Sequence, residues 1–192
     1  IDLTDNYRDI AKAYFPKAII CADSFHVLKH LTDDFRKIRT RCRRNTQDET
    51  LVYLLTKFKY IFNFGIDLDN TPRYNKHFKR YMNYRDIISI IFNNFPELER
   101  AYELKNQYIL FNRTADYKNA KEDLSDLIRK FGESNIKEYE EFYNLLINWN
   151  QEIINSFIKV RSKRINNSYI ESRNAKIERL IMNAYGFTNF KR

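Results

Sequence analysis

Two short stretches near the start of the chain contain side chains that could bind a metal ion. Asp2 follows the apolar Ile1, at what the sequence indicates is the end of a strand, and α/β active sites collect carboxylates at strand ends. Asp23 and His26 stand three residues apart in the first turn of a predicted helix, where both can face one point. They could ligate a metal or hydrogen-bond each other, but two ligands are few for zinc. The simpler interpretations are loop or helix-starting aspartates and a histidine that packs locally.

A third candidate carboxylate lies near the other end of the chain. Ser168 and Glu171 have the spacing of a capping box, which would give the glutamate a structural role. Glu171 also shares a helix face with Asn174, while Arg173 and Lys176 lie on another face. A carboxylate among many cations suits a metal ion next to a phosphate, so both interpretations stay open.

The chain carries an excess of positive charge. Lys and Arg number 34 against 25 for Asp and Glu, a net charge of +9, which points to a polyanion such as nucleic acid. The residues that we expect to contact DNA are Arg36, Lys37, Arg39, Arg41, Arg43, Arg44, Lys163, Arg164, Arg173 and Lys176. Binding through phosphates should weaken as salt rises. The alternative for residues 36–44 is a solvated charged face.

The elements that position these residues are mostly helical. Apolar periodicity predicts helices over residues 4–15, 24–44, 51–62, 76–93, 114–131, 135–160 and 168–182, and another that begins at Pro96. Ser24 is expected to cap the second helix, and Asn135 with Glu138 to form a capping box. The apolar run Ala18–Ala22 is the best candidate strand, and its lack of alternation predicts burial on both faces.

Composition excludes several classes of protein. No run approaches ~18 apolar residues, so we expect no membrane span. Two cysteines cannot build a disulfide framework, so we expect a reducing cytoplasm. Three glycines exclude Gly-rich phosphate loops. Because the chain starts at Ile1 and stops without a helix terminator, we expect it to be a fragment of a longer protein.

Two blocks of residues resemble the catalytic domain of bacterial DDE transposases of the ISL-three insertion-sequence family. The first block comprises Ile1-Asp2-Leu3, Tyr7, Phe15-Pro16-x-Ala18 and Asp23-x-Phe25-His26-Val27-x-Lys29. The second comprises Asn167, Ile170-Glu171, Asn174, Lys176-Ile177 and Ala184-Tyr185-Gly186-Phe187-x-Asn189-Phe190. The order and spacing of both blocks fit the family, and the middle of the chain matches only as an all-helical insertion.

The resemblance implies a ribonuclease-H-like fold in which two aspartates and one glutamate hold two Mg²⁺ ions. Asp2 matches the second aspartate of the family and Glu171 its glutamate, so these two are the implied catalytic and metal-binding residues. Asp23, His26 and Asn174 would be accessory. The first aspartate belongs on an earlier strand, which this chain does not contain.

We therefore expect an α/β protein, a partial ribonuclease-H-like domain with few strands and a large all-α insertion. Residues 1–44 would belong to that domain, 45–160 to the insertion, and 161–192 would return with the glutamate-bearing helix. The implied function is Mg²⁺-dependent phosphodiester hydrolysis and strand transfer, moving an insertion sequence, in an intact homo-oligomeric protein of the bacterial cytoplasm.

This chain alone is expected to bind DNA without cleaving it, because the first aspartate is missing.

Two other functions stay open. A non-catalytic helical nucleic-acid-binding module is the main alternative. A helical protein-interaction domain, for which the charge of +9 would be incidental, is the third.

Overall fold

The structure is a computed structural model that describes residues 1–161, 163–164 and 168–183, with only the backbone for 168–171. It is mostly helical, as predicted. The α-helices are α1 (Asp5–Tyr14), α2 (Ser24–Asn45), α3 (Glu49–Lys57), α4 (Tyr84–Asn94), α5 (Pro96–Thr114), α6 (Tyr117–Glu133), α7 (Glu140–Asn148), α8 (Asn150–Asn155) and α9 (Ser168–Asn183). Two 3₁₀ turns, η1 (Lys59–Phe62) and η2 (Lys137–Tyr139), join them.

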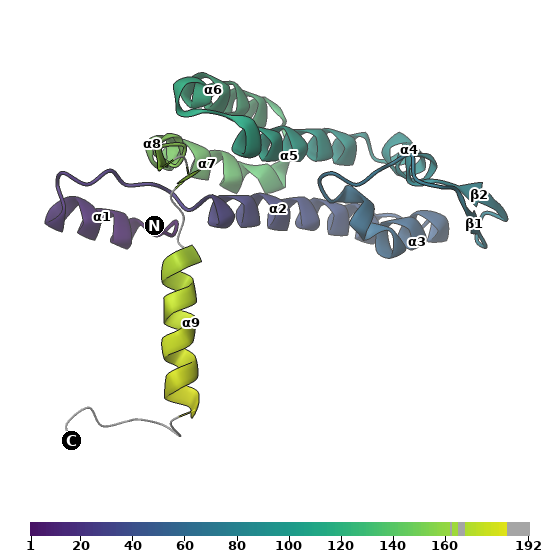
Figure 1. Cartoon of the computed structure of the whole chain (residues 1–192). Coiled ribbons are helices and arrows are strands. Elements are labelled where there is room, and N and C mark those ends of the chain that lie inside the picture. Colours follow the sequence, from purple (N-terminus) through teal and green to yellow (C-terminus); the bar gives the residue numbers. More distant parts are fainter. Residues whose placement is uncertain (162, 165–167, 184–192) are drawn as a thin grey trace.

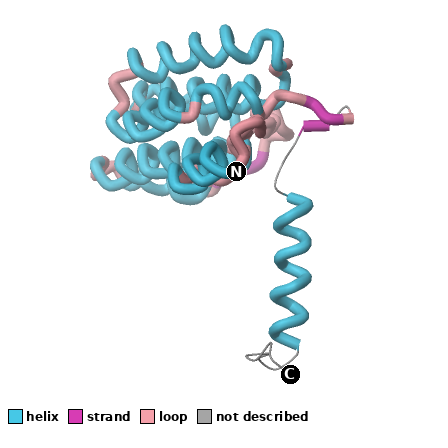
Figure 2. The backbone as a smooth tube through the Cα atoms, turned by 90° about the vertical axis from the view of Figure 1, so that its left-hand side faces the viewer, coloured by secondary structure: helices cyan, strands magenta, loops and turns pink. Residues whose placement is uncertain are grey.

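The helices lie in stacked layers, with α9 extending away from them (Figures 1 and 2). The long helix α2 packs along α5, α5 packs on α6, and α6 packs on α7 and α8. The apolar stripe of α2, including Leu31, Phe35 and Ile38, is therefore buried in the same core as the helices that follow it. This core binds α2 to the helical body that residues 45–160 form.

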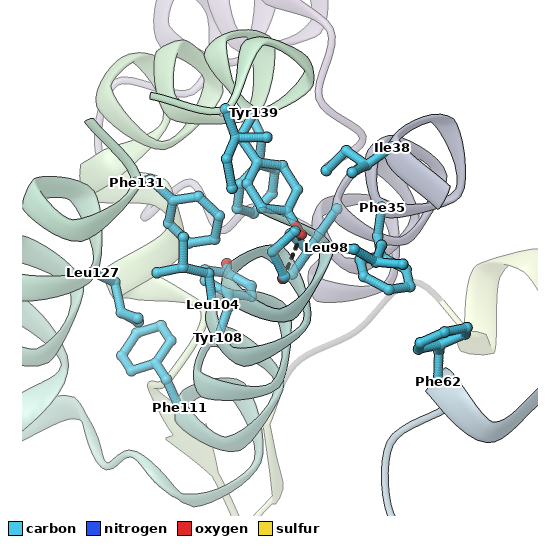
Figure 3. Packing of buried hydrophobic residues seen from close by; sticks show 14 of the residues in the cluster. Phe35, Ile38, Phe62, Leu98, Leu104, Tyr108, Phe111, Leu127, Phe131 and Tyr139 are labelled. Atoms are coloured by element: carbon cyan, nitrogen blue, oxygen red, sulfur yellow. Dashed lines mark hydrogen bonds between the residues drawn. The ribbon is translucent and has the colours of Figure 1, made fainter. Parts of the chain in front are cut away.

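Aromatic rings pack among aliphatic side chains in the core (Figure 3), and some of the rings meet edge to face. The Phe142 ring lies 5.2 Å from Tyr108 at 86°, and Phe131 lies 5.1 Å from Tyr139. The fully buried Tyr139 hydroxyl donates a hydrogen bond to the carbonyl of Ala101 at 2.8 Å. Since a buried hydroxyl without a partner is costly, this bond also fixes how η2 sits on α5.

Several helix boundaries follow local chemistry that the sequence reveals. Pro96 occupies the first turn of α5, as predicted. The cap of α2 differs from the prediction: Asp23, not Ser24, accepts the hydrogen bond from the Phe25 amide at 2.9 Å. The predicted capping box at Asn135 is also wrong, because Glu138 turns toward Arg41 instead.

The predicted helix over residues 76–93 is wrong in its first half. β1 (Arg73–Asn75) and β2 (Arg80–Met82) form an antiparallel hairpin there, and α4 begins only at Tyr84. The Asn75 side chain accepts hydrogen bonds from the amides of His77 and Phe78, which closes the turn. A second small hairpin pairs β3 (Lys159–Val160) with β4 (Lys163–Arg164).

Residues 18–23, all of which the structure describes, contain no assigned strand. Ile19 is 65% exposed, so the prediction that Ala18–Ala22 is buried on both faces is wrong. The segment is nevertheless held by the helical body, since the side-chain amide of Asn155 donates a hydrogen bond to the Ile20 carbonyl at 2.8 Å. The Ala22 amide donates in turn to the carbonyl of Glu152 at 2.9 Å.

Lys105 is a cation enclosed by the helical body. Its ammonium donates to the carbonyl of Phe62 and lies 4.6 Å from the centre of the Phe35 ring and 4.9 Å from that of Tyr102. The residue is 3% exposed. Burial lowers the pKa of Lys105 from its ordinary value of 10.5 to about 8.

This lowered pKa predicts a pH-dependent stability. Between about pH 8 and 10.5 the folded chain has lost the Lys105 proton while the unfolded chain still holds it, so folding gains stability as pH rises. Between about pH 8 and 10.5 the free energy of unfolding of the wild type should rise by about 1–3 kcal/mol relative to that of Lys105→Met. Urea unfolding of both proteins across the pH range measures the difference, and a constant difference would contradict the assignment.

Candidate metal centre

The backbone near the start of the chain brings two predicted strand ends together. The Ile1 nitrogen donates to the Cys21 carbonyl at 2.7 Å, and the Asp23 amide donates to the Ile1 carbonyl at 2.9 Å. Ile1 is thus hydrogen-bonded to the residues on either side of Ala22. This is the hydrogen-bond pattern of parallel strands, with Ile1 and Ala22 as the paired residues. Asp2 and Asp23 each lie one position beyond the paired residues Ile1 and Ala22, so their carboxylates leave the same edge.

His26 adds an imidazole to these two carboxylates. Its Nδ1 lies 3.5 Å from Oδ1 of Asp2 and 3.8 Å from Oδ2 of Asp23. One ligand atom from each of the three residues lies within 4.8 Å of the others. The first turn of α2 places His26 on the same side as Asp23, and the edge of the Phe25 ring system meets the imidazole at 89° with 5.5 Å between centres.

The cluster has the chemistry of a divalent cation site. Nδ1 of His26 is buried and has no hydrogen-bond partner among the residues that the structure describes, although two carboxylates face it at distances too long for a hydrogen bond. A cation between the three groups could bind that nitrogen and one oxygen of each carboxylate. The two carboxylates suit Mg²⁺ or Mn²⁺, whereas an imidazole is a ligand more typical of Zn²⁺ and other transition metals. Asp23 is buried while the Asp2 side chain is 45% exposed, so the centre is open on the Asp2 side.

The other carboxylate of the predicted site, Glu171, belongs to α9, and its side chain lies outside what the structure describes. Its predicted approach to Asp2 therefore stays a prediction. Asn174 is exposed on α9, as are Arg173 and Lys176. The structure thus unites Asp2 with two of the three residues that the resemblance marked as accessory, Asp23 and His26.

Arg41 differs from the other cations of α2 because the helical body uses it. It donates to Glu138 at 2.6 and 3.0 Å, and to both oxygens of Glu97 at 3.0 Å. These bonds raise the pKa of Arg41 and lower the pKa of Glu138. A guanidinium that joins η2 and α5 to α2 is a structural clamp, which sets Arg41 apart from the predicted DNA contacts.

Three other predicted DNA contacts on α2, Arg36, Lys37 and Arg44, are exposed. The Arg36 guanidinium lies 3.2 Å from Oδ1 of Asp33. The Lys37 ammonium lies 2.7 Å from Oδ1 of Asp34. Arg39 is half-buried and donates to the Leu55 carbonyl at 2.5 Å. Burial, and then the charges of Arg43 and Arg36, lower the pKa of Arg39.

Cations of α2 line two hollows on the surface. One, of about 490 Å³, is lined by Arg36, Lys37, Thr40, Arg41, Arg44 and Asn45. The other, of about 270 Å³, is lined by the buried Lys105 and by an exposed cation that sequence reasoning missed, Lys59. The alternation of lysines and aromatic residues in Lys57-Phe58-Lys59-Tyr60 was the available signal for Lys59.

The predicted cations near the end of the helical body have different roles. The Arg164 guanidinium lies 4.1 Å from the centre of the Phe157 ring and donates to the carbonyls of Asn112 and Ser156. It therefore ties the β3–β4 hairpin to the bundle. Lys163, beside it, is exposed.

Comparison with known proteins identifies the family of the chain. A family model described as a transposase, of the ISL3 type of DDE transposases, matches residues 1–192. No curated protein and no solved structure is similar enough to match the chain. None of the described helices has the length and apolar character needed to cross a membrane. The match extends over the whole sequence, and the chain therefore belongs to the ISL-three (ISL3) family of DDE transposases.

Proposed function

We propose that the chain contributes part of the catalytic site and part of the DNA-binding surface of a transposase that moves an insertion sequence. The observation that carries the proposal is the convergence of Asp2, Asp23 and His26 at the edge of two paired extended segments. That placement is typical of ribonuclease-H-like and other α/β active sites. Residues 1–44 and 161–192 would belong to such a domain, with 45–160 as its helical insertion.

The residues of this chain have distinct tasks in the proposal. Asp2, on the open side, and Asp23, on the buried side, would hold a divalent cation, and Glu171 would add its carboxylate from α9. When bound, two such ions activate water or a 3′-hydroxyl and stabilise the leaving oxygen of a phosphodiester. His26 would offer its Nδ1 as a further ligand from the first turn of α2.

DNA would lie along the accessible cations. Arg36, Lys37, Arg39, Arg43 and Arg44 on α2 would contact phosphates without reading sequence. Lys163, Arg173 and Lys176 would extend this contact toward α9. Action at two element ends favours a homo-oligomer of the intact protein. A non-catalytic nucleic-acid-binding module would use the same cations but would need no metal at Asp2.

Binding of Mn²⁺ to this chain distinguishes the two functions. We expect Asp23→Ser to weaken Mn²⁺ binding by at least about 10-fold, since it removes a ligand while serine still caps α2. Asp48→Ser is the matched control, because Asp48 caps α3 in the same way, through the Thr50 amide, and lies outside the cluster. Calorimetry or the electron paramagnetic resonance of free Mn²⁺ measures both. Equal affinity in the two variants would contradict the metal centre.

A further inference from the structure

A cavity lies beneath the β1–β2 hairpin, far along the chain from the candidate metal centre. It measures about 330 Å³, at the lower end of the ~300–1,000 Å³ range of small-molecule sites. Residues of α3, η1, the hairpin and the start of α4 enclose it. Its aromatic lining residues are Tyr53, Phe58, Tyr60, Tyr74 and Tyr84.

The aromatic rings form a continuous wall. Tyr60 and Tyr84 meet edge to face with centres 5.5 Å apart, and Tyr60 lies 6.1 Å from Phe58. Phe58 in turn lies 5.9 Å from Tyr53, whose ring stacks on His77 at 4.7 Å. Tyr60 remains 39% exposed. Such a wall offers flat π surfaces to an entering ring.

The polar groups around this wall favour an anion. Lys57, Arg73 and Lys76 line the cavity, and its lining residues include no carboxylate. The Lys57 ammonium lies 5.4 Å from the centre of the Tyr53 ring. The nearby Asp69 is engaged with Arg85 at 2.5 and 2.7 Å. Burial and the Tyr84 hydroxyl raise the pKa of Tyr60 to about 12, so this phenol stays neutral at physiological pH.

The cavity also adjoins the basic surface of α2. Tyr60 lines both this cavity and the neighbouring hollow that contains Arg36, Arg39 and Lys59. A strand whose phosphates follow α2 therefore passes the mouth of the aromatic cavity. Aromatic surfaces joined to a phosphate-binding groove are the recognition chemistry of unpaired nucleotides.

We infer that this cavity holds one unpaired nucleotide of the bound DNA, with its base against Tyr60 and Tyr84 and its phosphate near Lys57 and Arg73. The inference rests on the proposed function, since it takes DNA as the partner. A base inside a duplex is stacked on both faces and cannot enter, so the chain should prefer DNA that presents an unpaired base.

Two DNA duplexes that differ by one unpaired adenosine test the inference. The full chain should bind the duplex with the unpaired adenosine about 10-fold more tightly than the fully paired duplex, since stacking on an aromatic side chain is worth ~1–3 kcal/mol per base. 2-Aminopurine at the unpaired position should lose fluorescence on binding. Tyr60→Leu should remove the preference and the quenching, and Tyr60→Phe should keep both. Tyr117→Ala changes an equally exposed tyrosine on α6, away from this cavity, and should change neither.

Each outcome has a distinct meaning. Equal affinity for both duplexes overturns the inference and leaves the proposed function standing. A preference that Tyr60→Leu and Tyr84→Leu both retain, in variants with wild-type circular dichroism and melting, also overturns it. Failure to bind either duplex at low salt contradicts the proposed function itself.

Discussion

Asp2→Asn should abolish DNA cleavage by the complete transposase, with a rate loss of at least about 1,000-fold. The amide keeps the size of the side chain but removes the negative charge with which Asp2 faces His26 and Asp23 at the open edge of the cluster. Without that charge a divalent cation cannot be held in line with the scissile phosphate, and a misplacement of ~1 Å can cost ~100-fold. Cleavage of labelled DNA carrying the element ends measures the rate.

Two controls make this result specific. Asp5→Asn changes a neighbouring exposed aspartate that pairs with Arg8 at 2.7 Å, and it should leave cleavage within about 2-fold of wild type. DNA affinity should be unchanged in Asp2→Asn, because Asp2 contributes no positive charge. Glu171→Gln should match the loss of Asp2→Asn. Cleavage by Asp2→Asn within 10-fold of wild type would refute the assignment of Asp2.

Arg41→Ala should lower the free energy of unfolding by about 2–4 kcal/mol, the largest stability effect that we expect from a cation of α2. Its guanidinium makes four hydrogen bonds to Glu97 and Glu138, from two other elements. The Glu138 side chain is only 14% exposed, so its charge would remain desolvated and without its main partner. Arg41→Lys should recover only part of the loss, since lysine lacks the planar fork.

Arg44→Ala is the matched control, because Arg44 is an exposed arginine of the same helix. Arg44→Ala should change the free energy of unfolding by less than about 0.5 kcal/mol. It should weaken DNA binding and make the binding constant less sensitive to salt. Combining Arg41→Met with Glu97→Gln and Glu138→Gln should restore much of the stability, as no buried charge is then left unpaired. If Arg41→Ala weakens DNA binding without changing urea unfolding, the clamp interpretation is wrong.

The structural clamp shows why charge alone could not identify the DNA contacts. In the sequence, Arg41 is one of several equivalent cations between Phe35 and Asn45. Its partners lie 56 and 97 positions away, and only packing of α5 and η2 on α2 brings them together. Arg164 was ambiguous for the same reason, because the Phe157 ring and the Asn112 carbonyl that hold it are tertiary neighbours.

The hairpin is a second case in which tertiary structure overruled local pattern. Residues 76–83 have enough apolar spacing to be predicted as helix, but the strands beside the turn are only three residues long. So short a strand has too few alternating positions for a period of two to be detected. Asn75 and Met82 are buried against α3 and α4, and that contact selects the hairpin.

The sequence by itself determined the helical character, the first-turn proline of α5 and the residue types of the candidate metal centre. These depend on periods and spacings of a few residues, which local sterics and backbone hydrogen bonding decide. Only the tertiary structure decided that Asp2 joins Asp23 and His26, that Arg41 is a clamp, and that an aromatic cavity adjoins the basic surface. Each of these requires contacts between segments far apart in the chain, and such contacts follow from how the helices pack.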